Sequence, residues 1–284
     1  MKNLKALLIK AKELSQGEDS GLPDTLRDLI FYSPKFPARL KQQQLLNDAE
    51  TFNVIIHDPH FAKGDLEVNC FRWGNGKRKV LLTHGWGSKA ADFSELITDL
   101  RAHPDLEIIA FDAPGNGSSE GKLTNLLLFA RAVEAIVAQH GTPEILIGHS
   151  LGCMANAIAM QNFPEKVKVL ISLAPLIQLK EHFVGTLNSV NIPQYAQDAF
   201  FEEFSKIFNV NAEDFTLTAL YQRQPELVHL LAYDVNDKVS PVEYMREFLS
   251  LHPGIKTVKF DDIGHEKMLK DERVVEAIIA SLEH

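Results

Sequence analysis

Four short apolar segments, separated by helical patterns, constrain the fold of this chain most strongly. They are residues 79–83, 106–111, 144–148 and 168–173, and their apolar residues run on without alternating with polar ones. Uninterrupted apolar runs of this length are typical of strands that are buried on both faces of a parallel sheet. Helical patterns lie between them, at about 91–100, 123–140 and 151–162. This alternation predicts an α/β fold with a mostly parallel central sheet flanked by helices.

The rhythm of strands and helices is interrupted once and then resumes. Residues 176–224 contain helical stretches with several phenylalanines and no strand pattern. Apolar strands then return at 227–233 and 256–260, with helices at about 242–251 and 271–282. Before the first buried strand, residues 52–57 and 66–73 alternate as half-exposed strands do. Residues 1–50 are helical in pattern and are broken by Gly and Pro.

These patterns predict three parts. We expect an N-terminal helical arm at 1–50, an α/β core at 51–175 and 225–282, and a helical cap at 176–224. A chain of 284 residues is long enough for one such core with an insertion.

Charge and cysteine content narrow the class of partner. The net charge is −9, which does not supply the basic surface that a nucleic acid requires. The two cysteines are too few and too far apart for a disulfide framework, so we expect reduced thiols and a cytoplasmic protein. The first residues contain a Lys every few positions and no apolar core of a secretory signal, and no segment is long enough to span a membrane.

Residues 85–90 allow a dinucleotide hypothesis. They satisfy G-x-G-x-x-A after a predicted strand, and the next strand ends at Asp112. However, that acid is 27 residues beyond Gly85, which is far for this motif, and Trp86 stands where a pyrophosphate approaches the backbone. The hypothesis also leaves everything after residue 115 unexplained.

A serine between two glycines, G-H-S-L-G at 148–152, favours a different chemistry. It follows a buried strand and opens a helix that is rich in alanine. A turn this tight holds its middle residue, Ser150, exposed at the carboxyl end of the sheet, and glycines on both sides let strand and helix approach. The interpretation is a nucleophile elbow.

A serine nucleophile needs a base, and the base needs an acid that orients it. In this kind of fold the acid follows the serine and the histidine comes last. The strand at 227–233 is followed by Asp234 and Asp237, and the strand at 256–260 is followed by His265. All of these positions lie at carboxyl ends of predicted strands, where open α/β sheets place their sites. Asp234 and Asp237 both remain candidates at this point.

Four motifs in order resemble the α/β-hydrolase superfamily, in its serine-hydrolase (esterase- and acylhydrolase-like) branch, over about residues 52–282. They are H-G-W-G at 84–87, D-A-P-G-N-G-S-S at 112–119, D-K-V-S-P at 237–241 and G-H at 264–265. The resemblance implies that Ser150 is the nucleophile, Asp237 the triad acid and His265 the base. Asn116 departs from the pattern, because many relatives carry a bulky or basic residue there. The N-terminal arm lies outside the resemblance.

Further roles complete the expected site. The backbone N–H groups of Trp86 and Leu151 are expected to form the oxyanion hole. Trp86 and the cap residues Phe183, Phe200 and Phe204 are expected to line an apolar substrate pocket. Neither a metal nor another cofactor is expected, since no His, Cys and Asp cluster has ligand spacing.

The predicted function is hydrolysis of a carboxylic ester, or a related acyl bond, of a small and largely apolar substrate through an acyl-enzyme on Ser150. Carbon–carbon bond hydrolysis or acyl transfer on the same three residues is an alternative, and so is a non-catalytic ligand-binding module on the same fold. The sequence leaves the oligomeric state open.

Overall fold

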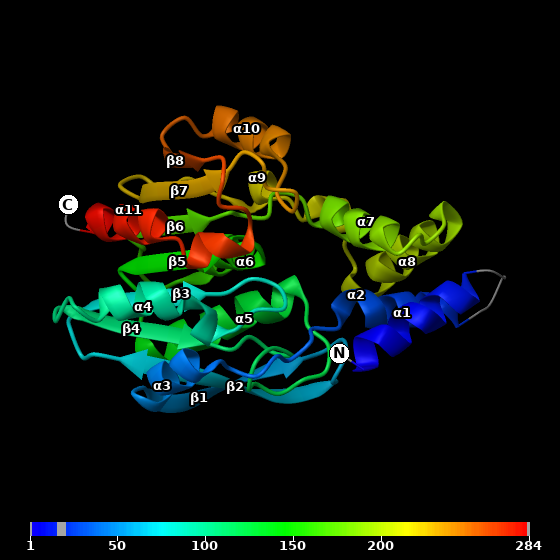
Figure 1. The fold of residues 1–284 in the computed structure, drawn as a ribbon, viewed down its shortest axis with the longest axis horizontal. Coiled ribbons are helices and arrows are strands. Elements are labelled where there is room, and N and C mark those ends of the chain that lie inside the picture. The colour runs from blue at the N-terminus through cyan, green and yellow to red at the C-terminus, as the bar shows by residue number, and fades with distance from the viewer. Residues whose placement is uncertain (1, 16–20, 283–284) are drawn as a thin grey trace.

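A single sheet organises the chain. The computed structural model describes residues 2–15 and 21–282. Within those ranges the sheet has eight strands in the order β1-β2-β4-β3-β5-β6-β7-β8 (Figure 1). The strands are β1 (Glu50–Asp58), β2 (Gly64–Trp73), β3 (Arg78–Thr83), β4 (Leu106–Phe111), β5 (Ile145–His149), β6 (Val169–Leu173), β7 (Val228–Asp234) and β8 (Lys256–Phe260). β2 pairs antiparallel with β1 and β4, and every other neighbouring pair is parallel.

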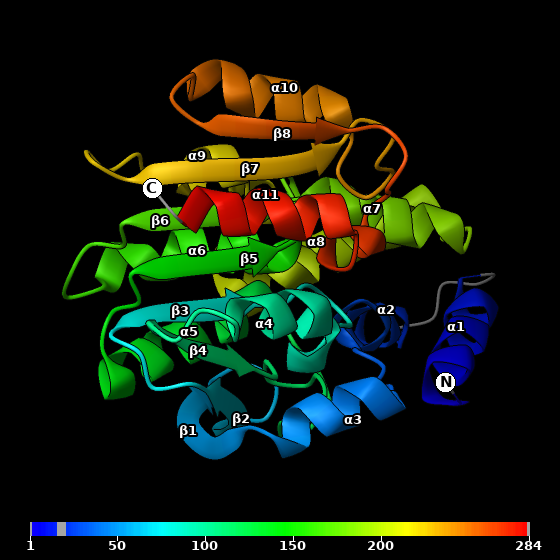
Figure 2. The same cartoon turned by 60° about the vertical axis from the view of Figure 1, so that its left-hand side comes forward.

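Some helices cover the two faces of this sheet, and others lie beyond the carboxyl ends of its parallel strands (Figures 1 and 2). The helices are α1 (Lys2–Leu14), α2 (Leu22–Phe31), α3 (Leu40–Asn47), α4 (Ser94–Leu100), α5 (Leu126–His140), α6 (Leu151–Ala159), α7 (Leu179–Ser189), α8 (Gln194–Phe208), α9 (Leu217–Leu220), α10 (Val242–Leu251) and α11 (Glu272–Leu282). The core separates into two clusters, one with buried residues of α3, α4 and α11 and the other with those of α5, α6 and α10. The predicted α/β fold with a mostly parallel sheet is confirmed.

Strand pleating explains why the central strands are apolar throughout. In β3, Leu81 packs into one cluster while Val80 and Leu82 pack into the other. In β5, Leu146 packs into the same cluster as Leu81, and Ile147 packs into the same cluster as Val80 and Leu82. Successive side chains of a strand point to opposite faces, so a sheet covered on both faces needs an apolar residue at every position.

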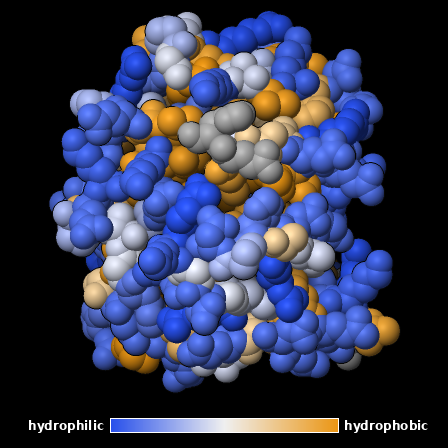
Figure 3. All heavy atoms as spheres, turned by 90° about the vertical axis from the view of Figure 1, so that its left-hand side faces the viewer, coloured by the Kyte–Doolittle hydropathy of each residue, from blue (hydrophilic) through white to orange (hydrophobic). Residues whose placement is uncertain are grey.

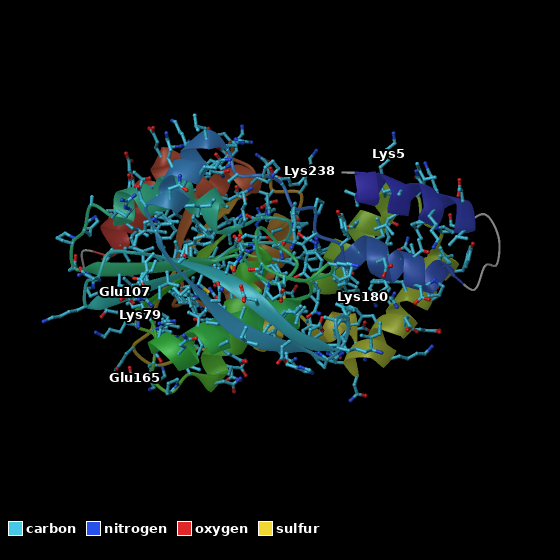
Figure 4. The ribbon with its side chains drawn as sticks, turned by 90° about the horizontal axis from the view of Figure 1, so that it is seen from below. Lys5, Lys79, Glu107, Glu165, Lys180 and Lys238 are labelled. Carbon is cyan, nitrogen blue, oxygen red and sulfur yellow. The ribbon has the colours of Figure 1, made fainter. Side chains whose placement is uncertain are left out.

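The segment between β6 and β7 forms helices α7, α8 and α9 at the carboxyl end of the parallel strands (Figure 2). α1 and α2 lie beside α8 at the same end of the molecule (Figures 1 and 4). α3 instead packs on the sheet side, where Trp73 Nε1 donates to Leu45 O at 3.0 Å. The boundaries of arm, core and cap stay a prediction. Contacts of α2 with α8 join the predicted arm to the predicted cap, and the bond from Trp73 to Leu45 joins the arm to the core.

The end of the molecule away from the cap helices is mostly hydrophilic, with apolar side chains gathered in its upper part (Figure 3). No helix in residues 2–15 and 21–282 has the length and apolar character needed to cross a bilayer.

Candidate active site

A strained turn presents Ser150. β5 ends at His149 and α6 begins at Leu151, so Ser150 is the single residue between them, with φ 53° and ψ −119°. Positive φ in a residue with a side chain costs about 1–3 kcal/mol and persists only where the surroundings enforce it. Here the packing enforces it, because β5 and α6 lie on either side of this one residue.

The flanking glycines allow that packing. A Cβ on Gly152 would lie 2.2 Å from the carbonyl oxygen of Thr83, at the end of β3. A Cβ on Gly148 would lie 2.8 Å from the backbone of Cys153 in α6. Any side chain at either position would force strand and helix apart, so the expected role of the two glycines agrees with the structure.

Three side chains that are distant in sequence meet at this turn. His265 Nε2 lies 2.8 Å from Ser150 Oγ, and His265 Nδ1 lies 2.6 Å from Asp237 Oδ2. Ser150 and Asp237 are buried, and the His265 side chain is 13% exposed. Burial of the three side chains lowers the local dielectric constant, which strengthens the electrostatic interactions among them.

The hydrogen bonds fix the tautomer of His265. Asp237 Oδ1 accepts from the backbone N–H groups of Val239 (2.8 Å) and Ser240 (3.2 Å), which orients the carboxylate. A carboxylate oxygen only accepts, so His265 Nδ1 donates to Oδ2. Nε2 then carries a lone pair that faces the Ser150 hydroxyl, as a general base requires.

Asp234, the rival acid, holds the loop instead. Its carboxylate accepts from the backbone N–H groups of Asn236, Ile263 and Gly264. Burial alone would raise the pKa of Asp234, but these three donors lower it. The carboxylate therefore ties the loop after β7 to the loop that carries His265.

The loop after β3 borders the serine. A Cβ on Gly85 would lie 2.9 Å from Ser150 Cβ, so the backbone before Trp86 is in close contact with the nucleophile. Among the described residues, the backbone N–H groups of Trp86 and Leu151 have no hydrogen-bond acceptor. A developing oxyanion needs donors of this kind, and the role expected for these two groups stays a prediction.

Two buried polar residues hold that loop in place. His84 contacts Gly85 O through Nδ1 (2.7 Å) and accepts from Ala113 N through Nε2 (2.9 Å). Asp112 accepts from Ala90 N and from Ser118 N. The predicted structural role of Asp112 agrees with these bonds, and burial lowers the pKa of His84.

The cap phenylalanines are packed against one another. Phe183, Phe200 and Phe204 are all buried. A cavity lined by Phe183, Phe204 and neighbouring side chains has a volume of about 10 Å³, near the minimum for one water. That these phenylalanines line a substrate pocket stays a prediction. Phe31 of α2 lies in the same cluster, a position that no motif in the sequence indicated.

An open groove of about 380 Å³ lies between α7 and the segment from Lys238 to Tyr244, which includes the first turn of α10. Leu176, which lines it, donates its backbone N–H to the backbone carbonyl oxygen of Ser150 at 3.2 Å, so the backbone that lines the groove is bonded to that of Ser150. His182 also lines it, and burial together with the charge of His265 lowers the pKa of His182 to about 4. Lys238, which also lines the groove, is exposed, and Figure 4 labels it together with Lys180 of α7. His182 could not be found from the sequence, since a single His in a predicted helix forms no motif.

Two other features resemble sites without forming one. A hollow of about 690 Å³ among α3, α4 and α11 is lined mainly by charged side chains and lies away from Ser150. Ser172 Oγ lies 2.9 Å from His229 Nε2, but both residues are buried and His229 Nδ1 has no hydrogen-bond partner. This second Ser–His pair lacks an orienting acid.

Comparison with known proteins finds curated relatives that match part of the chain. A pimeloyl-[acyl-carrier protein] methyl ester esterase of Proteus mirabilis is 36% identical over 114 residues, which cover 38% of this chain and 41% of that protein. A monoglyceride lipase of Rattus norvegicus is 29% identical over 148 residues, 48% of each chain. The chain spans about half the length of the curated relatives it matches.

Solved structures share the fold over a longer span. An esterase of Pyrococcus furiosus superposes with a TM-score of 0.61 at 17% identity and covers 89% of this chain and 97% of that one. A thermophilic esterase of Thermogutta terrifontis gives 0.58 at 18% identity, covering 83% and 98%. The family model described as alpha/beta hydrolase fold matches residues 79–224, just over half of the 284 residues. The chain therefore belongs to the α/β hydrolase family.

Proposed function

We propose that this protein is a serine hydrolase that cleaves a carboxylic ester, or a related acyl bond, of a small substrate through an acyl-enzyme on Ser150. One observation carries the proposal: His265 bridges Ser150 and Asp237 at 2.8 and 2.6 Å, with two unpaired N–H groups beside the serine. The names of the curated relatives, an esterase and a lipase, support ester chemistry.

In the first half-reaction His265 Nε2 takes the proton of Ser150 Oγ as that oxygen attacks the carbonyl carbon. The carbonyl oxygen becomes negative and accepts from the N–H groups of Trp86 and Leu151. Asp237 stabilises the imidazolium by accepting from its Nδ1. The imidazolium then gives its proton to the leaving alcohol oxygen, the carbon–oxygen bond breaks, and an acyl ester remains on Ser150.

In the second half-reaction water enters where the alcohol left. His265 Nε2 takes a proton from the water as its oxygen attacks the acyl carbon, and the same two N–H groups stabilise the negative oxygen. The proton then passes to Ser150 Oγ, the acyl bond breaks and the acid leaves. Donors of this kind lower the barrier by about 3–4 kcal/mol each in studied enzymes.

We also propose a cytoplasmic location. Cys70 and Cys153 are both free and buried, and burial raises the pKa of each thiol to about 12. Free thiols are typical of proteins in the reducing cytoplasm, whereas disulfides form in oxidising compartments, so the two free cysteines support this location.

The test is Ser150→Ala with short p-nitrophenyl esters. Turnover should be lost with a nearly unchanged melting temperature, since the hydroxyl makes one hydrogen bond on an already strained turn. Ser172→Ala is the matched control, because Ser172 also has a histidine partner but no acid behind it. Turnover in Ser150→Ala comparable with that of the unsubstituted protein would refute the nucleophile.

A further inference from the structure

Phe31, the last residue of α2, connects the N-terminal helices to the cap. Its side chain is 1% exposed. Its ring centroid lies 5.6 to 6.2 Å from those of four cap phenylalanines, Phe183, Phe200, Phe204 and Phe208. It also lies 5.0 Å from Phe61, in the turn between β1 and β2. A residue outside the family match thus occupies the centre of the cap's aromatic cluster.

The chain around Phe31 is fastened to the core. Thr124 N donates to Phe31 O at 2.8 Å, and Tyr32 forms an isolated bridge with Leu123. Ser33 Oγ donates to Asn116 Oδ1 at 2.5 Å, with both residues buried. Asn116 therefore anchors the N-terminal segment. These bonds give the Phe31 ring a fixed position.

A short path of contacts leads from Phe31 to the nucleophile. The Phe31 ring lies 6.3 Å from the Trp86 ring, and Trp86 follows Gly85, whose backbone abuts Ser150. Trp86 also lies 6.1 Å from Phe183. The aromatic cluster around Phe31 leaves a cavity of only about 10 Å³, whereas the groove between α7 and the Lys238–Tyr244 segment has about 380 Å³.

The cavity and the groove differ in chemistry as well as in size. The cavity is lined by phenylalanines and leucines, apart from Asn125. The open groove mixes apolar side chains, among them Leu176, Ile177 and Tyr244, with the polar Gln178, Glu181, His182 and Lys238. An acyl chain is apolar, so its favourable direction is toward the aromatic cluster, and that direction is blocked by packed rings.

We propose that Phe31 is a specificity-determining residue that closes the apolar side of the site and restricts the protein to esters of short acyl groups. The proposal rests on the proposed ester hydrolysis. Loss of the Phe31 ring opens space next to Trp86 into which a longer acyl chain extends. Each methylene that becomes buried there contributes about fourfold to kcat/KM.

The test compares p-nitrophenyl octanoate with p-nitrophenyl acetate in the unsubstituted protein, Phe31→Ala and Phe31→Leu. The measured quantity is the ratio of the two kcat/KM values, because a change in folded fraction or in the oxyanion loop affects both esters alike. The ratio should favour acetate in the unsubstituted protein and rise by about 15-fold in Phe31→Ala, as expected for two further buried methylenes. Phe31→Leu removes less volume, keeps more of the packing and should shift the ratio in the same direction by less.

Phe248→Leu is the control, since Phe248 is equally buried but its ring contacts are with Tyr221 and His252. Its ratio should equal that of the unsubstituted protein. An unchanged ratio in Phe31→Leu and in folded Phe31→Ala would overturn the proposal while leaving ester hydrolysis standing, as would a preference for octanoate in the unsubstituted protein. Failure of the unsubstituted protein to hydrolyse either ester would instead overturn the proposed function, and this inference with it.

Discussion

His149 donates a hydrogen bond from Nε2 to the backbone carbonyl oxygen of His265 at 3.1 Å, and the two rings lie 5.0 Å apart. The residue before the nucleophile therefore holds the residue that is proposed as its base. Burial, with the charge of His265 as the next cause, lowers the pKa of His149 to about 3, so its ring is neutral at ordinary pH. A neutral ring donates without competing for the proton that His265 transfers.

Replacing His149 with Phe should therefore reduce kcat/KM for a short ester by about 3- to 10-fold, the value of one net hydrogen bond. Gln keeps an N–H donor and should recover part of the loss. The position of the acid limb in the pH profile should stay the same in both variants, since His149 does not titrate near it. Equal losses in Phe and Gln would show that packing, and not the hydrogen bond, is responsible.

Asp237→Asn should lower kcat by about 10⁴-fold, the loss measured when the acid of a studied triad is amidated. The amide can donate to His265 Nδ1 and so favours the tautomer that has no lone pair on Nε2. Kinetics on a short ester measure the loss. Asp234→Asn is the matched variant: it should weaken the loop that carries His265 and lower stability, with a much smaller effect on kcat. A larger loss of kcat in Asp234→Asn than in Asp237→Asn would identify Asp234 as the acid.

Gly152→Ala should abolish turnover and destabilise the fold, because its Cβ would stand 2.2 Å from Thr83 O. Gly185→Ala in α7 is the contrasting change, since a Cβ there meets nothing within 4 Å. That substitution should raise the unfolding free energy by about 0.5–1 kcal/mol, the helix preference for Ala over Gly. Urea unfolding of both variants checks the pair. A Gly152→Ala variant that folds and reacts normally would contradict the tight elbow.

The proposed triad could be predicted because each of its members lies in the turn or loop after a strand. Ser150 directly follows β5, Asp237 lies three residues after the end of β7, and His265 lies five residues after the end of β8. The parallel strands end at one edge, so Ser150 and His265 meet there, and the resemblance selected Asp237 over Asp234. The position of Phe31 could not be predicted, since its partners in α7 and α8 lie more than 150 residues away and packing between aromatic rings follows no sequence period. For the same reason the sequence could not show how closely Phe183, Phe200 and Phe204 pack.

Acid should destabilise the protein through its buried histidines. Burial lowers the pKa of His149 and of His229 to about 3, against 6.5 for a histidine in the unfolded chain. Between pH 6.5 and 3 the unfolded chain binds protons that the folded chain does not. The unfolding free energy therefore falls as the pH falls through this window, by up to about 1.4 kcal/mol per pH unit for each group.

His229→Gln tests this dependence, because glutamine can keep the hydrogen bond to Ser172 and cannot titrate. Urea unfolding at pH 7, 5.5 and 4.5 should show a shallower loss of stability in the variant than in the unsubstituted protein, whatever their difference at pH 7. Parallel pH dependences in the two proteins would mean that His229 is already protonated in the folded state.

The most direct measurement of the central claim is labelling with a fluorophosphonate, followed by mass spectrometry of the intact protein and its peptides. A serine activated by His265 should take up a single phosphonyl group, on Ser150, and His265→Ala should label far more slowly. No adduct on the folded protein, or an adduct of equal rate in Ser150→Ala, would contradict an activated nucleophile at the end of β5.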